Sequence, residues 1–342
     1  MKLKVLELST IEKYDLQKMY KVYDSWPEIA RKSYESNHEP VDFHDIDHIV
    51  LAGMGGSGAI GDLFTSILSK SDIHVSRVKG YLLPNTIDKN TLVVVTSVSG
   101  NTSETLAVLD SAKKIDCNLI AFSSGGKIEK ICKNNQILFR KIPLFHSPRT
   151  SLINFTYSIL NILNSILPIE KNDIIESLNE LDIIREQICS KNLSDSNPAI
   201  NLAKWISDIP IIYYPNGLQS VAIRFKSSLQ ENVKTHVIIE DVIETCHNGI
   251  MSWERPSRVQ PILLRGQDDY IKTKERFEII KEFFVENNID FKEIYSVSGN
   301  ILTKIISLIY MLDYASIYKA ILTKTDPSPV KSIDFVKTRL NV

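Results

Sequence analysis

The sequence has few cysteines and arranges none of them as a metal or redox motif. Its 342 residues include four cysteines, with no C-x-x-C spacing and no cluster of cysteine with histidine. A disulfide framework or a zinc site needs paired or clustered ligands. We therefore expect free, mostly buried thiols in a reducing compartment, and no metal site.

The sequence also lacks an excess of charge of either sign. Its 40 basic and 41 acidic residues leave a formal net charge of −1. Proteins that bind nucleic acids or anionic membranes usually carry a basic excess. Neither a nucleic acid nor a membrane is therefore expected as a partner, and any anion must be recognised locally.

Long uninterrupted apolar runs are missing as well. The N-terminal stretch MKLKVLELSTIEKYD contains no apolar segment followed by a cleavage site, so secretion is not indicated. The longest apolar run begins at Asn300 and is interrupted by Lys304, Asp313 and Lys319. This pattern is typical of a buried helix rather than a membrane span. We therefore expect a cytoplasmic protein.

Short apolar stretches do alternate with helical ones along most of the chain. Such alternation favours parallel sheets covered by helices on both faces. The stretch HIVLAGMGGSGAIGDLFTSIL is echoed in pattern by IPIIYYPNGLQSVAIRFKSSL, which indicates an internal duplication. The predicted strands of the first half lie at 48–53, 73–78, 91–97, 118–124 and 137–143, and those of the second half are IPIIYYP, PILLRG and FKEIYSVSG.

The chain length suits two domains. The first forty residues and the segment KNDIIESLNELDIIREQICS are helical in pattern, and the polar stretch KNLSDSNP is typical of a linker. We expect an N-terminal helical segment at 1–45, a first domain at 46–165, a helical linker at 166–197 and a second domain at 198–342.

A glycine-rich loop, LAGMGGSGAIGD, follows the first predicted strand. Read as Gly53-x-Gly55-x-x-Gly58, it satisfies the dinucleotide-binding pattern. That pattern also needs an acid at the end of the next strand, to hold the ribose hydroxyls. The only acid at a suitable spacing is Asp72, which precedes the strand instead of ending it. An NAD(P)-dependent oxidoreductase is therefore a weak alternative.

Two other nucleotide interpretations of this loop are weaker still. The far end of the next strand carries Arg77 and Lys79, which could serve the 2′-phosphate of NADP. A P-loop is excluded because no Gly-Lys-Ser/Thr follows the glycines.

Hydroxyl and amide side chains crowd a second loop, VVVTSVSGNTSETL, between a strong strand and a helix. Hydroxyls and free N–H groups at a helix N-terminus make a pocket for a phosphate. The alternative is ordinary N-capping by Ser99 or Thr102, but one such residue would suffice. We therefore favour a sugar phosphate as the ligand of this loop, which carries Ser97, Ser99, Asn101, Thr102 and Ser103.

The pair GMGGSG and TSVSGNTSET resembles a SIS domain, the sugar-isomerase module of phosphosugar enzymes and regulators. Three later segments, PRTSL, QENVKTHVIIEDVIETCHNG and DPSPVKSIDFVKTRL, resemble the bifunctional phosphoglucose/phosphomannose isomerases in order and spacing. The resemblance implies an α/β fold with two doubly wound parallel-sheet SIS subdomains, which are αβα sandwiches, besides a helical N-terminus and linker. The first SIS domain would bind phosphate, and the second would carry catalytic residues.

An aldose–ketose isomerase needs a carboxylate base, a ring-opening acid/base and a cation near the developing charge. Composition alone would make Glu231 a solvated carboxylate, but the resemblance makes it the base that moves a proton between C2 and C1. The family motif, written N-E-N, is here Gln230-Glu231-Asn232. His247 matches the ring-opening histidine, which typically comes from the partner subunit and so implies a homodimer.

Two further cations match family positions. The resemblance assigns Arg149 to steadying the cis-enediolate and Lys337 to hydrogen bonding during ring opening, with Lys331 as the competing lysine. Val330 stands where some bifunctional members have a threonine, which makes activity on mannose 6-phosphate less secure than on glucose 6-phosphate. The residues expected to bind the substrate phosphate are Gly55, Gly56, Ser57, Ser97, Ser99 and Thr102.

The resemblance therefore predicts a metal-independent enzyme without a cofactor. It would interconvert glucose 6-phosphate, mannose 6-phosphate or both with fructose 6-phosphate, in glycolysis and gluconeogenesis. The alternative is a non-catalytic SIS-type protein that binds a sugar phosphate in a regulatory role. Such a protein would need the serine-rich loops but not Glu231, His247 or Lys337, whose joint presence favours the enzyme.

Overall fold

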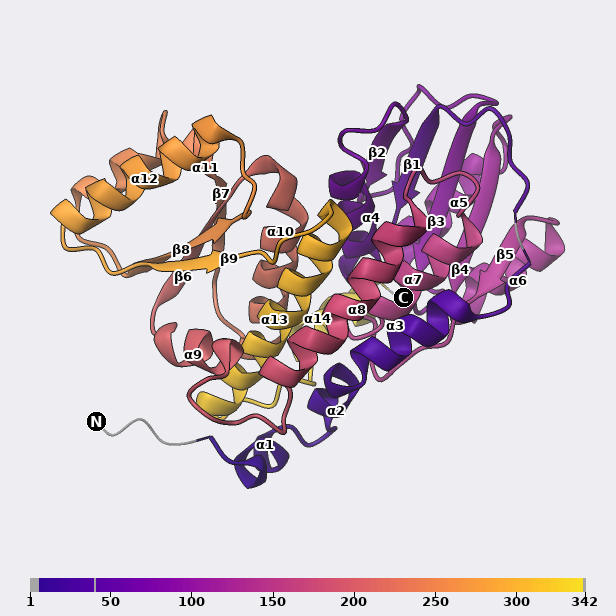
Figure 1. Cartoon of the computed structure of the whole chain (residues 1–342). Coiled ribbons are helices and arrows are strands. Elements are labelled where there is room, and N and C mark those ends of the chain that lie inside the picture. The colour runs from indigo at the N-terminus through magenta and orange to yellow at the C-terminus, as the bar shows by residue number, and fades with distance from the viewer. Residues whose placement is uncertain (1–5, 40, 341–342) are drawn as a thin grey trace. The chain divides into compact units, whose positions relative to one another are not determined.

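The computed structural model describes residues 6–39 and 41–340. These residues form two compact units (Figure 1). The first-sheet unit comprises Ser25–Glu170 and the described residues from Val330 on. The second-sheet unit comprises Lys171–Pro329 and the described residues up to Asp24. The boundaries of these units differ from those of the four segments expected from the sequence (1–45, 46–165, 166–197 and 198–342). That division stays a prediction.

The first-sheet unit contains a five-stranded parallel sheet in the order β2-β1-β3-β4-β5. Its central strand β3 is buried along its whole length, which explains the apolar run LVVV at its centre. The order reverses at β1, so the sheet is doubly wound. The strands are β1 (His48–Ala52), β2 (His74–Val78), β3 (Thr91–Ser97), β4 (Asn118–Ser123) and β5 (Leu138–Lys141).

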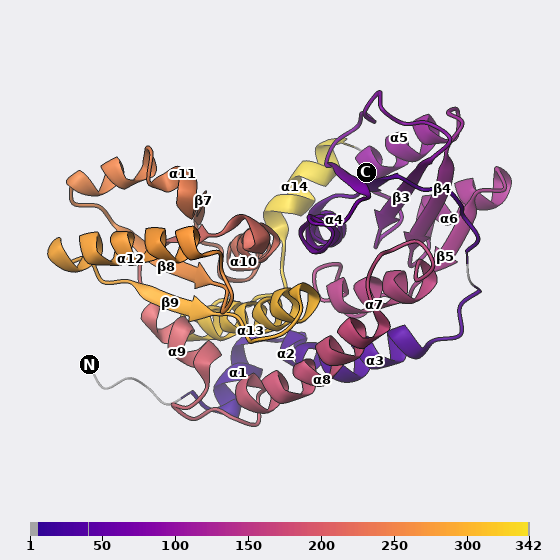
Figure 2. The same ribbon diagram turned by 45° about the horizontal axis from the view of Figure 1, so that its top comes forward.

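Helices cover both faces of this sheet. One face packs its valines against two helices in a cluster that includes Val50, Val93, Val108 and Ile128. Figure 2 shows these two helices on one side of the strands and the others on the opposite side. The first pair is α5 (Ser103–Ala112) and α6 (Gly126–Asn134), and the other face carries α4 (Gly55–Ile67), α7 (Leu152–Ile162) and, outside α7, α3 (Trp26–Glu35).

The second-sheet unit repeats this topology with one strand fewer. Its four parallel strands follow the order β7-β6-β8-β9, which corresponds to β2-β1-β3-β4 of the first sheet. The two orders support the duplication indicated by the sequence, and the expected α/β fold class is confirmed. The strands are β6 (Ile209–Tyr214), β7 (Ile238–Asp241), β8 (Val259–Arg265) and β9 (Lys292–Tyr295).

Helices also enclose the second sheet. In both ribbon views α11 and α12 lie on one face and α9 and α13 on the other. The first face is filled by aromatic side chains of α12 that pack on β6 and β8. The helices of this unit are α1 (Leu8–Tyr14), α2 (Met19–Asp24), α8 (Lys171–Ile188), α9 (Pro198–Trp205), α10 (Gln219–Ser228), α11 (Val242–Thr245), α12 (Ile271–Glu286) and α13 (Ile301–Leu322).

The apolar helix α13 is the core of this unit. By length and composition it could cross a membrane, but 83% of its most apolar window is buried, against α8, α9 and α10 among others. Each charge that interrupts it has a partner. Lys304 pairs with Asp268 at 2.7 Å, Asp313 pairs with a buried arginine, and Lys319 donates to the main-chain oxygen of Ile206. The predicted buried helix is confirmed.

Three local features differ from the sequence prediction. The helical N-terminus is interrupted after Asp15, whose carboxylate accepts a hydrogen bond from the Tyr20 N–H at 2.8 Å. The strand β7 was not expected, because only four residues form it and none is fully buried. A helix, α14 (Lys331–Leu340), ends the described chain. It is exposed throughout, so it shows no core periodicity that would predict it.

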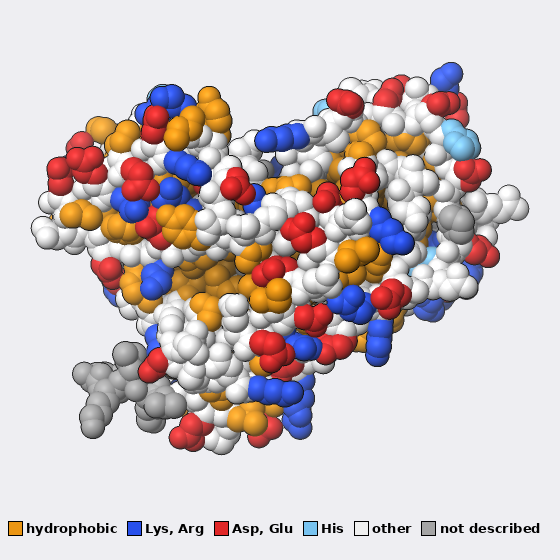
Figure 3. All heavy atoms as spheres, in the orientation of Figure 1, with side chains coloured by type: hydrophobic (Ala, Val, Ile, Leu, Met, Phe, Trp, Pro, Cys, Tyr) orange, Lys and Arg blue, Asp and Glu red, His pale blue; other side chains and the backbone are white. Residues whose placement is uncertain are grey.

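The surface carries both signs of charge. On the face shown in Figure 3, acidic and basic side chains are interspersed and no broad area of one sign appears. This agrees with the balanced composition and leaves anion recognition to local features of the fold.

Candidate active site

The glycine loop joins β1 to α4, which begins at Gly55, three residues after the strand ends. Among the described residues no side chain caps this helix. Gly56 is required by packing, because a Cβ there would lie 2.9 Å from the main-chain oxygen of Pro148 and 3.3 Å from the N of Arg149. The loop therefore holds the Arg149 backbone against the start of α4, and the Arg149 residue is buried.

Ser57 connects the glycine loop to the second predicted phosphate loop. It is buried, and its Oγ accepts a hydrogen bond from the N–H of Val98 at 3.0 Å. The hydroxyl proton of Ser57 is then available to donate. Two segments that the sequence separates by forty residues thus meet at one edge of the first sheet, where the parallel strands end.

The β3–α5 turn is organised by hydroxyls that do not cap its helix. Ser97 Oγ accepts from the Gly100 N–H at 3.1 Å and lies 3.1 Å from Thr102 Oγ1. Thr102 occupies the N-cap position of α5, yet in the described structure no side chain makes a capping bond there. The exposed Ser99 accepts from the Asn101 N–H at 3.3 Å. The capping alternative is therefore not realised.

The same turn contains two features that the sequence argument missed. Gly100 has a φ of +70°, and a Cβ there would run into the main-chain oxygen of Gly125. Thr105 lies in the first turn of α5, and its buried Oγ1 has no partner among the described residues. The motif TSVSGNTSET contains this threonine, so its position in the motif could have indicated it.

In the structure, the two cations that could bind the 2′-phosphate of NADP are paired with a carboxylate. Arg77 Nη1 and Lys79 Nζ both bind the carboxylate of Asp62, at 2.7 Å and 2.5 Å, and the Asp62 side chain is 1% exposed. Asp62 belongs to the glycine-loop helix α4. Neither cation is therefore free to take a 2′-phosphate.

Arg149 lies in a turn that side-chain hydrogen bonds hold firmly before α7. The N–H of Ser147 donates to Thr150 Oγ1 at 3.1 Å, and Ser151 Oγ donates to the Ser147 oxygen at 3.0 Å. Trp26 Nε1 donates to the main-chain oxygen of Thr150 at 3.1 Å. These contacts give the arginine a rigid base.

Glu231 lies in the second-sheet unit, at the centre of a π-helical turn. The helix α10 passes directly into this turn, Leu229–Val233. Lys234 ends it with a φ of 63°, and its ammonium donates to the main-chain oxygens of Glu231 and, at 2.8 Å, Pro329. Isolated π turns are rare and are frequent at functional sites. Glu231 is half-buried there.

A buried ion pair lies next to this turn. Arg224 Nη2 lies 2.6 Å from Asp313 Oδ2, and their side chains are 3% and 0% exposed. Burial lowers the pKa of Arg224, but the carboxylate of Asp313 more than offsets this and raises it above its usual value, with a further contribution from Glu231. The guanidinium is therefore a permanent cation, and it attracts the Glu231 carboxylate.

The remaining predicted residues are exposed. His247 follows α11, and its N–H donates to the Glu244 oxygen at 2.9 Å. No contact in the described part of the second-sheet unit joins it to Glu231. Lys331 and Lys337 lie on α14 of the first-sheet unit. Because they are six positions apart on one helix, they leave its axis in directions about 120° apart.

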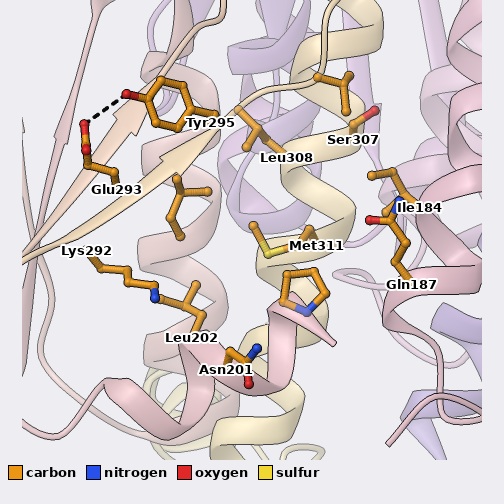
Figure 4. A pocket seen from close by; sticks show the side chains of 13 residues that line it. Ile184, Gln187, Asn201, Leu202, Lys292, Glu293, Tyr295, Ser307, Leu308 and Met311 are labelled. Carbon is orange, nitrogen blue, oxygen red and sulfur yellow. Dashed lines mark hydrogen bonds between the residues drawn. The ribbon is translucent and has the colours of Figure 1, made fainter. Parts of the chain in front are cut away.

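A cavity of about 330 Å³ in the second-sheet unit contains none of the predicted residues. It is lined by α8, α9, β9 and α13, and Figure 4 shows Leu202, Leu308 and Met311 forming its apolar part, with Tyr295 bonded to Glu293 at 3.1 Å. No group of three or more metal-ligating side chains could hold an ion in the part of the chain that the structure describes.

Two family models and a solved structure match this chain. The SIS domain family matches residues 42–166, and the family described as "Bacterial phospho-glucose isomerase C-terminal SIS domain" matches residues 195–340. A hypothetical protein from Thermus thermophilus, TT0462, has a similar fold, with a TM-score of 0.71 at 13% identity over 98% of this chain and 89% of that one.

Two similar sequences carry the same name. A bifunctional phosphoglucose/phosphomannose isomerase from Caldicellulosiruptor bescii is 32% identical over 94% of this chain and 98% of its own length. One from Aquifex aeolicus is 26% identical over 95% of this chain and 99% of its own length. Matched by these relatives over nearly its whole length, the chain belongs to the family of bifunctional phosphoglucose/phosphomannose isomerases.

Proposed function

We propose that this protein is a sugar-phosphate isomerase that interconverts glucose 6-phosphate and mannose 6-phosphate with fructose 6-phosphate. Its relatives carry this activity in their names. One observation carries the proposal. In the described part of the first-sheet unit, the N-termini of α4 and α5 both have no side-chain cap, and the Ser57–Val98 hydrogen bond joins the loops that precede them. Helix N-termini of this kind favour a phosphate dianion.

In this proposal the phosphate is bound by the two loops of the first-sheet unit. Main-chain N–H groups at Gly55 and Gly56 approach it without steric hindrance, and hydroxyls donate to its oxygens. The side chains that supply these hydroxyls are Ser57, Ser97, Ser99 and Thr102.

Proton transfer is assigned to Glu231. After His247 and Lys337 assist ring opening, the Glu231 carboxylate removes the proton from C2 of the open aldose. The C–H electrons form the C1=C2 double bond, and the carbonyl electrons move to O1 as an enediolate, which Arg149 stabilises. Return of the proton from Glu231 to C1, as the O2 proton passes to O1 and the C2=O2 bond forms, gives the ketose.

The same intermediate serves both epimers. Glucose and mannose 6-phosphates differ only at C2, which becomes planar in the enediolate. Rotation about the C2–C3 bond presents either face of C2 to the Glu231 carboxylate. One base can therefore act on both substrates.

The test is isomerisation by the purified protein. Glucose 6-phosphate or mannose 6-phosphate is supplied, and fructose 6-phosphate is measured with and without EDTA. We expect turnover of both sugars that EDTA leaves unchanged. Binding of the sugars without turnover would establish the alternative regulatory protein, and stoichiometric NAD(P) binding would establish the oxidoreductase.

We further propose a homodimer in which His247 acts on the substrate bound by the partner subunit. Its exposure after α11 supports this role. Mixing two inactive variants, Glu231→Gln and His247→Ala, tests it. In a twofold dimer one site of each mixed dimer would regain both residues, which restores about a quarter of the wild-type activity. No recovery after subunit exchange would mean that His247 acts within its own subunit or not at all.

A further inference from the structure

The π turn that carries Glu231 is flanked by a buried polar network. The Arg224 guanidinium of α10 donates to both carboxylate oxygens of Asp313 on α13, over 2.6 to 3.1 Å. Both helices contact each other and the turn. Burying an ion pair has a large desolvation cost, which only good geometry and additional hydrogen bonds offset. This pair therefore needs further hydrogen bonds. One comes from the hydroxyl of Tyr23, which donates to Asp313 Oδ2 at 3.2 Å, and others connect the pair to the turn.

Hydrogen bonds from this network reach both sides of Glu231. Ser228, the residue before the turn, donates to Asp313 Oδ1 at 2.5 Å. Asn232, the residue after Glu231, donates to Ser316 Oγ at 2.8 Å, and Ser316 donates to the main-chain oxygen of Asp313 at 2.6 Å. Both side chains are buried. The turn is thus tied to one short segment of α13 on either side of the glutamate.

Such ties matter because a π turn is not a favoured conformation by itself. Its hydrogen bonds span one residue more than those of an α-helix, and it occurs mostly as a single turn. If the turn relaxed to α-helical geometry, the following residues would rotate by about 100° around the axis. The direction of the Glu231 side chain therefore depends on whatever holds the π turn.

We propose that the Arg224–Asp313 pair and the Asn232–Ser316 hydrogen bond position the Glu231 carboxylate for proton transfer. The inference rests on the proposed function, in which Glu231 is the base. None of the four side chains is assigned a contact with substrate, so they are positioning residues. They act by fixing the backbone of the turn.

Two conservative variants test this role. Ser316→Ala removes the acceptor of Asn232 and the hydrogen bond from Ser316 to the Asp313 main chain, but leaves the ion pair in place. Arg224→Lys keeps the charge but loses the forked guanidinium. Displacement of a reacting group by about 1 Å can lower turnover about a hundredfold. We expect kcat to fall about tenfold in Ser316→Ala and about a hundredfold in Arg224→Lys, with KM changed less than about twofold. Asp313→Asn, which keeps the shape, is expected to fall between them.

The control is a second buried arginine of the same unit. Arg265 binds Glu278 at 3.1 Å and Glu293 at 2.6 Å, and its side chain is 5% exposed. Arg265→Lys should lower the unfolding midpoint as Arg224→Lys does, while kcat stays within about twofold of wild type. A merely structural role of the network would make the two variants alike in kcat.

The outcomes separate this inference from the proposed function. No turnover by wild type, or full activity of Glu231→Gln, would remove the proposed function itself. If wild type is active and Glu231→Gln is not, but Ser316→Ala and a folded Arg224→Lys keep the wild-type kcat, the positioning inference is wrong. If Arg224→Lys does not fold, Ser316→Ala alone decides between these results.

Discussion

The two units begin with the same strand–turn–helix segment but use it differently. After β1 the helix α4 starts directly at a glycine. After β6 a 3₁₀ turn, Asn216–Leu218, comes before α10. In the echoed pattern Leu218 stands where the first segment has Ser57, and both are buried. The serine forms a hydrogen bond with another loop, whereas the apolar leucine side chain can only pack.

The ends of the two helices differ in the opposite way. The helix α4 ends at Ile67 with ordinary backbone bonds from Leu68, whereas α10 continues into the π turn around Glu231. The first segment thus places its special feature at the helix N-terminus, where partial positive charge favours an anion. The second segment has its special feature at the C-terminal end of the helix, where the π turn sets the direction of the Glu231 side chain. In the proposed function, the same topology therefore binds the phosphate in one unit and carries the base in the other.

The largest expected effects are kinetic, and they test whether the two units have different roles. Glu231→Gln removes the proposed base but none of the proposed phosphate ligands, so kcat should fall about 10²- to 10⁴-fold while substrate binding is retained. Ser57→Ala leaves the buried Val98 N–H without its acceptor, so KM should rise about tenfold with little change in kcat. Steady-state kinetics and calorimetric titration with fructose 6-phosphate measure both. Equal effects on kcat and KM in the two variants would contradict the division of labour.

A matched pair of glycine variants tests the two turns. Gly56→Ala places a Cβ 2.9 Å from the Pro148 oxygen, whereas Gly217→Ala, the corresponding change after β6, meets nothing within 4 Å. We expect Gly56→Ala to lower the free energy of unfolding by about 1–3 kcal/mol and to raise KM. Gly217→Ala should stay within about 0.5 kcal/mol of wild type. Denaturant unfolding of both variants provides the measurement, and similar losses would show that the turns are equivalent.

The smallest expected effect concerns the choice between epimers. Val330 precedes α14 in the first-sheet unit and is half-buried. If a hydroxyl at this position helps to admit mannose 6-phosphate, Val330→Thr should raise the ratio of kcat/KM for mannose over glucose 6-phosphate by up to about tenfold. Val336→Thr, at a position that is 52% exposed on the same helix, is the control. A ratio that is unchanged in Val330→Thr, or changed equally in both, would remove this role.

Much of the fold could be predicted from local patterns. The run TLVVVTS predicted a strand because it is mostly apolar, and both faces of β3 are indeed buried. The helix α13 was predicted as a buried helix because charges interrupt an otherwise apolar run. Elements without such a pattern were missed. The strand β7 is short and partly exposed, and α14 buries no face. A periodic apolar pattern arises where one face of an element is buried. Elements that bury few side chains therefore have no such pattern and cannot be predicted from it.

The candidate site was predicted only as a set of residue types in order. The motifs indicated Ser57, Ser97 and Thr102 as hydroxyls near a phosphate, and the structure joins the two loops that carry them through Val98. Thr105 belongs to the same motif but was not chosen, because its buried hydroxyl lies just beyond the cluster of Ser97 to Ser103. The motifs also did not show that Arg77 and Lys79, the candidate ligands of a nucleotide phosphate, both bind Asp62.

By itself, the sequence determined the alternation of strands and helices, the glycine and hydroxyl loops, and Glu231 as the residue to examine. Only the tertiary structure decided that this glutamate lies in a π turn. An α-helix and a π turn have nearly the same local residue preferences, and what selects between them here is a network across 89 residues, from Arg224 to Asp313. Interactions between distant segments leave no periodic trace in the chain, because the folded backbone alone brings them together.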